Sequence, residues 1–94
     1  MATVVFAPFI QHHVNCPPSE AHGSSVREVL ENYFREFRGA RGCIFDEQGR
    51  LRPRLTVFVD GAIIEDRVGL TDPVHLQAQL FIQGMQLDTE YENL

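Results

Sequence analysis

Three stretches of the chain have patterns that predict β-strands: one is a β-branched and aromatic run, and in two apolar and polar residues alternate. The stretches are residues 3–10 (TVVFAPFI), 51–59 (LRPRLTVFV) and 77–83 (QAQLFIQ). The first is apolar on both faces, which is typical of a central strand or of a strand whose second face belongs to a binding patch. In the second, Pro53 lacks a backbone donor, so regular pairing should begin after it.

The segments around these strands carry turn and loop signals. Residues 11–16 (QHHVNC) either continue the first strand or form its hairpin partner. Residues 17–24 (PPSEAHGS) have the Pro, Gly and Ser content of a loop. Asp60-Gly61 is a strong hairpin signal, and it predicts a short return strand at residues 62–64.

A helical period follows the first loop. Ser25 and Glu28 form a capping box, and Gly39 lies where a C′ glycine ends a helix. The apolar residues between them fall three or four positions apart and form one stripe: Val26, Val29, Leu30, Tyr33, Phe34 and Phe37. This pattern predicts one amphipathic helix with one buried face.

The predicted elements follow the order strand, strand, helix, strand, short strand, strand. One helix would then cover one face of a mixed sheet of four to five strands, which is an α+β fold. This arrangement is the ubiquitin-like β-grasp, in which the last strand lies between the first and the third.

Alternation within the third and last strands predicts an exposed aromatic patch. Phe58 and Phe81 point away from the helix because their neighbours along each strand must face it. The first strand contributes its second apolar face, and Arg52 and Arg54 are expected to give the patch a basic rim. We therefore predict a partner-binding surface, with a patch covered by the C-terminal tail or by a second copy as the alternative.

Composition limits the classes of function. The 94 residues predict a single domain spanning 1–94, and 44% of them are apolar. A net charge of −5 argues against nucleic acid or an anionic membrane as the partner. All eight basic residues are arginines, which excludes lysine-based Schiff-base and P-loop chemistry. No stretch approaches a membrane span and no secretory leader is evident, so we expect a cytoplasmic protein.

The residues disfavour two alternatives with site chemistry. His12 and Cys16 lie about 13 Å apart on a straight strand, too far for one metal ion. Cys16 and Cys43 with the histidines could serve a hydrolase, but nothing supplies an orienting group or an oxyanion hole. Glu65-Asp66 is expected to be solvated. We therefore predict no catalytic residue, no metal and no cofactor.

Three motifs in this order resemble a known family. They are the helix SVREVLENYF, the strand and turn VFVDG (57–61) and the loop GLTDPV (69–74). They resemble the sulfur-carrier family that includes the molybdopterin-synthase small subunit (MoaD) and the thiamine sulfur carrier (ThiS). Members of that family end in Gly-Gly, and an activating enzyme adenylates the terminal carboxylate before it becomes a thiocarboxylate. Glycine suits such an end because the tail must thread a narrow channel.

The present chain departs from the family in its tail, residues 84–94. Asp88 and Thr89 stand about where the diglycine would be, and the 94 residues contain no Gly-Gly. We therefore predict a non-catalytic interaction module derived from a sulfur carrier, with an active carrier using an atypical tail as the alternative. The resemblance implies a protein partner, either an activating or sulfur-transfer enzyme, or self-association.

Overall fold

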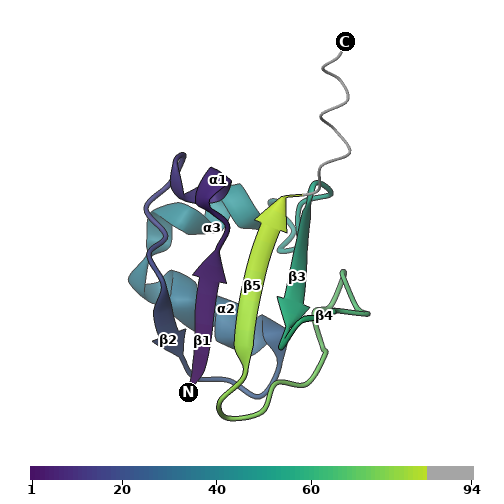
Figure 1. Ribbon diagram of the computed structural model, residues 1–94. Helices are drawn as coiled ribbons and strands as arrows, with labels where there is room; N and C mark the ends of the chain where they lie inside the picture. The colour runs from purple at the N-terminus through teal and green to yellow at the C-terminus, as the bar shows by residue number, and fades with distance from the viewer. Residues whose placement is uncertain (85–94) are drawn as a thin grey trace.

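The computed structural model describes residues 1–84, so the predicted tail positions Asp88 and Thr89 lie outside the described residues. These residues form five strands and three helices (Figure 1). They are β1 (Ala2–Phe6), α1 (Pro8–Gln11), β2 (Ser19–Ala21), α2 (Val26–Glu36), α3 (Arg38–Ile44), β3 (Leu55–Val59), β4 (Ala62–Ile63) and β5 (Gln79–Gly84).

The five strands form one mixed sheet in the order β2-β1-β5-β3-β4. Strand β1 runs parallel to β5, and the other neighbouring pairs are antiparallel. The last strand thus lies between the first and the third, as predicted. In Figure 1, α2 and α3 lie behind the sheet, and the opposite face of β1, β5 and β3 is turned toward the viewer.

Helix α2 begins as the sequence predicts. The Ser25 side chain accepts a hydrogen bond from the Glu28 amide at 3.2 Å. The Glu28 carboxylate accepts from Ser24 rather than from Ser25, so the reciprocal half of the capping box is displaced by one residue. The predicted stripe is confirmed, since all of its residues but the half-buried Phe37 are buried: Val26, Val29, Leu30, Tyr33 and Phe34.

The segment after β1 differs from the prediction. The first strand ends at Phe6 rather than residue 10, because Pro8 opens the short helix α1. Residues 12–16 therefore neither extend β1 nor pair with it. The hairpin partner is β2, which forms inside the predicted loop through antiparallel pairing of Ala21 with Ala2. Its residues, Ser-Glu-Ala, carry little β-propensity, so the pairing with β1 decides their conformation.

The predicted helix end is also corrected. Helix α2 stops at Glu36, and Gly39 lies within the second helix, α3, rather than at a C′ position. Two glycines in seven residues give α3 a weak intrinsic propensity. Its inward residues Ala40 and Ile44 are fully buried, so packing against the core stabilises this helix.

The core fills the space between the sheet and the helices. Five inward side chains of the three central strands have no exposed surface: Val4, Phe6, Val57, Leu80 and Ile82. Regular β3 pairing starts at Leu55, beyond Pro53 as expected. No helix within residues 1–84 is long and apolar enough to cross a membrane.

Candidate functional site

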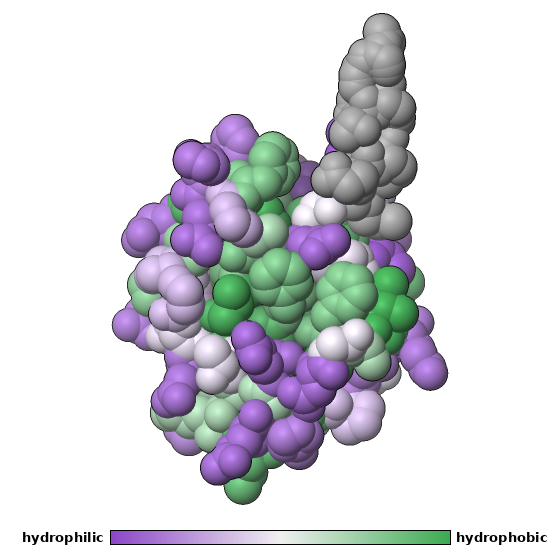
Figure 2. Space-filling view, viewed as in Figure 1, coloured by the Kyte–Doolittle hydropathy of each residue, from purple (hydrophilic) through white to green (hydrophobic). Residues whose placement is uncertain are grey.

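Four apolar side chains lie in one row across the open face of the sheet. Val5 of β1 is paired with Phe81 of β5, Phe81 with Phe58 of β3, and Phe58 with Ile63 of β4. Paired residues point to the same face, so the row crosses four strands. Figure 2 shows apolar side chains gathered in the middle of this face, over β1, β5 and β3. We call Val5, Phe81, Phe58 and Ile63 the apolar row.

A shallow hollow of about 390 Å³ opens beside the two aromatic rings of the row. Phe58 and Phe81 are half-buried, which leaves part of each ring accessible at the hollow. Polar groups from the ends of the strands complete the lining. The lining residues are Phe58, Asp60, Gly61, Gln79, Phe81 and Gln83. The outward direction of both phenylalanines agrees with the prediction from alternation.

Asp60 borders the hollow because of the hairpin turn between β3 and β4. Asp60 and Gly61 adopt φ values of +51° and +88°, the left-handed conformation of a two-residue turn. The Asp60 carboxylate accepts from the Gln79 amide at 2.9 Å and contacts His75 Nε2 at 2.8 Å. These two interactions, the Gln79 bond first, lower the pKa of Asp60. Asp60 is thus a fixed carboxylate at one end of the hollow.

The neutral form of His75 fits the contact with Asp60. The Gln77 amide donates to His75 Nδ1 at 3.2 Å, so that nitrogen acts as an acceptor. The proton of the neutral ring then resides on Nε2 and is donated to Asp60. The sequence analysis treated Asp60 only as a turn residue. The two-residue turn itself was the available signal, because it places Asp60 directly after Phe58 and Val59.

The two predicted rim arginines lie apart from one another. Arg52 donates from its amide to the Ile44 carbonyl and from Nε to the Gly42 carbonyl, so α3 holds its side chain. It lines a different hollow together with Asp46, Glu47 and Gln48. Arg54 precedes β3 at the end of the strand where β5 ends, and not at the Asp60 end. Arg52 therefore does not line the hollow, whereas the rim role of Arg54 stays a prediction. The charged residue that lines the hollow is Asp60, which is acidic.

Arg52 lies apart because regular β3 pairing begins only at Leu55, after Pro53 as expected. Residues before Leu55 are outside the ladder, so strand alternation does not fix the direction of Arg52. Arg50 also lies before the strand, and its exposed side chain pairs with Asp46 at 3.5 Å.

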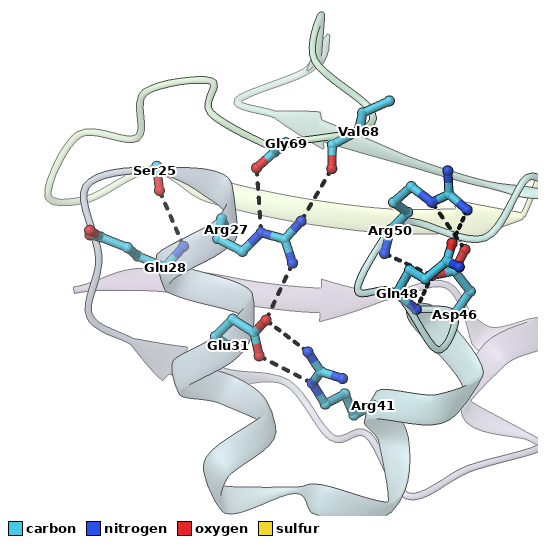
Figure 3. A network of polar contacts seen from close by, with 10 residues as sticks. All are labelled: Ser25, Arg27, Glu28, Glu31, Arg41, Asp46, Gln48, Arg50, Val68 and Gly69. Atoms are coloured by element: carbon cyan, nitrogen blue, oxygen red, sulfur yellow. Dashed lines mark hydrogen bonds and ion pairs between the residues drawn. The ribbon is translucent and has the colours of Figure 1, made fainter.

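A network of ion pairs ties the helical side of the molecule together (Figure 3). Glu31 of α2 pairs with Arg41 of α3 at 2.9 Å and with Arg27 of its own helix at 3.3 Å. Arg27 also donates to the carbonyls of Val68 and Gly69 in the loop before β5. Hydrogen bonding to Arg41 lowers the pKa of Glu31. Every charge in this network has a partner, so we assign it a structural role.

Asp66 is a loop organiser rather than a freely solvated carboxylate. It accepts hydrogen bonds from the amides of Val68, Gly69 and Thr71, and from the Thr71 hydroxyl at 2.6 Å. The hydroxyl bond, followed by the Gly69 bond, lowers the pKa of Asp66 to about 2. The expectation that Asp66 is simply solvated is therefore wrong, whereas Glu65 is exposed.

This pKa predicts a pH dependence of stability. A carboxylate whose pKa is about 2 when folded and roughly 3.9 when unfolded stabilises the fold above pH ~4. That stabilisation is lost as the pH falls toward 2. We expect Asp66→Asn to lower Tm at pH 7, with the difference from wild type narrowing as pH approaches 2. Thermal melts between pH 7 and pH 2 measure this, and a Tm difference independent of pH would contradict it.

The histidines and cysteines do not assemble into a site. Cys16 is buried, whereas Cys43 and His12 are exposed. Burial raises the pKa of the Cys16 thiol, which disfavours the thiolate that a nucleophile needs. Within residues 1–84 no group of three or more His, Cys, Asp or Glu side chains is placed to hold a metal ion.

Comparison with solved structures identifies the architecture. A chain of the Amycolatopsis orientalis BexX/CysO complex superimposes with a TM-score of 0.76 at 21% identity, covering 90% of this chain and 96% of that one. Mycobacterium tuberculosis CysO, an antigen, superimposes with a TM-score of 0.75 at 16% identity, covering 90% of this chain and 99% of that one. SAMP1 from Haloferax volcanii superimposes with a TM-score of 0.71 at 12% identity, covering 88% of this chain and 92% of that one.

The fold is a ubiquitin-like β-grasp. The β-grasp fold that the sequence motifs implied is thus confirmed by these structures. At these identities the likeness establishes the β-grasp and leaves the function to be argued from the site. No family model and no curated protein matches the chain.

Proposed function

We propose that this β-grasp protein is an interaction module without catalytic chemistry of its own, which docks a protein partner through the apolar row. The observation that carries the proposal is the register of Val5, Phe81, Phe58 and Ile63 across four strands. Ile63 exposes 58% of its surface. Large apolar side chains gathered on one solvent face are typical of a surface that a partner covers.

The structural neighbours support a protein partner. One of them is a complex of CysO with a second protein, BexX, and another is a small archaeal modifier protein from Haloferax volcanii. By analogy, the partner of the present protein would be an activating or sulfur-transfer enzyme. Self-association through the apolar row is the competing use of the same surface.

Replacing both aromatics of the row tests the docking proposal. We expect Phe58→Ser with Phe81→Ser to fold and to lose the proteins that the wild-type bait retains from extracts of the source organism. Half-buried residues on the open face tolerate serine better than core residues do. The matched control is Phe9→Ser, an exposed aromatic of α1 outside the row. Unchanged retention by the folded double variant, compared by quantitative mass spectrometry, would contradict the proposal.

We also propose that the tail does not form a thiocarboxylate. The supporting observation is that Asp88 and Thr89 stand where the resembled family has Gly-Gly. Both carry side chains that an extended glycine tail lacks. After incubation with ATP, a sulfur source and an activating enzyme of the family, we expect intact mass to remain unchanged. A mass increase corresponding to exchange of oxygen for sulfur would instead favour the alternative function, an active sulfur carrier.

A reconstructed tail provides the matched control. The variant Asp88→Gly, Thr89→Gly, with residues 90–94 removed, supplies the diglycine end on the same β-grasp. If this variant acquires the sulfur mass and the wild type does not, the tail alone separates the protein from an active carrier. If neither reacts, the sheet face rather than the tail prevents recognition by that activating enzyme.

A further inference from the structure

Within residues 1–84, the outward side chains of the strands on the open sheet face include no arginine or lysine. In the described strands, a residue points outward if it belongs to the apolar row, lies two positions along the strand from a row residue, or is paired across strands with such a residue. The outward residues are Thr3, Val5, Glu20, Thr56, Phe58, Ile63, Gln79, Phe81 and Gln83. Glu20 is the charged residue among them, and the turn adds Asp60 at the hollow. Both charges are negative.

The hollow combines three features that suit one kind of side chain. The accessible parts of Phe58 and Phe81 offer aromatic surface, which attracts a cation. Asp60 offers a carboxylate at one end, and its side chain is 45% exposed. Gln79 and Gln83 offer amide groups along β5. An arginine side chain can stack its planar guanidinium on an aromatic ring and donate to a carboxylate at the same time.

We infer that the hollow binds an arginine side chain presented by an otherwise apolar segment of the protein partner. This inference rests on the docking surface proposed above. The apolar row receives the flanking apolar residues, and Asp60 receives the guanidinium. The two existing partners of Asp60 hold the carboxylate in place and leave acceptor capacity on its oxygens. The expected partner is therefore basic at this point.

A second copy of the chain fits the hollow less well than such a partner. A symmetric dimer that buries the apolar row against itself brings two copies of the same face together. Asp60 and Glu20 of each copy would then approach a face that carries the same negative charges. With a net charge of −5 on each chain, this juxtaposition is unfavourable.

Peptide titration followed by amide NMR tests the inference on the full chain. The probes are acetyl-Ala-Leu-Arg-Leu-Ala-amide and the same peptide with Gln or Glu in place of Arg. We expect the Arg peptide to shift the amides of Gly61, Gln79 and Phe81 more strongly than the other two. Asp60→Asn should weaken that binding about two- to fivefold, as for an exposed ion pair.

The controls separate this inference from the docking proposal. Asn tolerates the positive φ of residue 60 and keeps an acceptor for the Gln79 amide, so Asp60→Asn should fold. Glu20→Gln removes the other negative charge of the face and should leave binding unchanged. Equal binding of all three peptides, or no effect of Asp60→Asn, overturns the arginine inference but leaves the docking surface. Absence of shifts with every peptide overturns both, and concentration-dependent shifts without peptide assign the face to a second copy.

Discussion

Phe34→Ala is expected to lower the free energy of unfolding by about 3–5 kcal/mol, the cost of truncating a buried aromatic residue. Phe34 exposes only 3% of its surface and lies on the inward stripe of α2. Its ring meets Tyr33 at a centroid distance of 5.5 Å and Phe45 at 5.3 Å, both in edge-to-face geometry. The substitution therefore removes contacts that join α2 to the segment after α3. Against a total stability of about 5–15 kcal/mol, the loss is large enough to unfold much of the protein.

Urea denaturation followed by far-UV circular dichroism measures this loss. Phe9→Ala is the matched control, because it makes the same truncation at a side chain that is 65% exposed. We expect the control to change the free energy of unfolding by less than about 1 kcal/mol. An unchanged denaturation midpoint for Phe34→Ala would mean that the stripe of α2 is not the core face.

Gly23→Ala is expected to destabilise the protein by about 3 kcal/mol or more, through a backbone clash with added strain. Gly23 adopts a φ of +152°, and a Cβ atom there would lie 2.6 Å from the Val29 amide nitrogen and 2.8 Å from Val29 Cγ2. Neither a backbone atom of α2 nor a fully buried side chain can move away without disturbing the core. Glycine at this position lets the chain cross closely over the first turn of α2.

Gly39→Ala provides the control, because the same substitution there meets no clash. Gly39 lies in α3, and a Cβ atom at this position has no neighbour within 4 Å. We expect it to stabilise the protein by about 0.5–1 kcal/mol, the helix-propensity difference between the two residues. Thermal melts of both variants give the comparison. Equal effects of the two substitutions would show that the close approach at Gly23 can be relieved.

The main elements of the fold could be predicted because their signals are local. The stripe of α2 follows a helical period over a whole helix, and Ser25 marks its start. The turn at Asp60-Gly61 fixes both the position of β4 and its pairing with β3. In contrast, α1 depends on where β1 stops, and its four residues are too short to produce a periodic pattern.

The candidate site was predicted in part. Alternation of inward Val57 and Leu80 with outward Phe58 and Phe81 gave the direction of both aromatics, and the structure pairs them directly. Alternation failed for Arg52, because a side chain before the start of β3 is positioned by α3 and not by the sheet. Asp60 was assigned no role beyond the turn, since its place in the hollow depends on the distant residues His75 and Gln79.

The places of α2, β3, β4 and β5 along the chain, the buried face of α2 and the outward direction of the aromatic pair could all be predicted from the sequence. These features follow from periodicity and turn chemistry, which act between residues close together in the chain. Tertiary structure alone decided that β2 and α3 form, because Ser19–Ala21 and Arg38–Ile44 have weak intrinsic preferences. Pairing with β1 and burial of Ala40 and Ile44 stabilise them. The tertiary structure also decided the charge of the hollow. The residues that line the hollow come from β3, β5 and the turn at Asp60, and only the folded sheet brings these segments together.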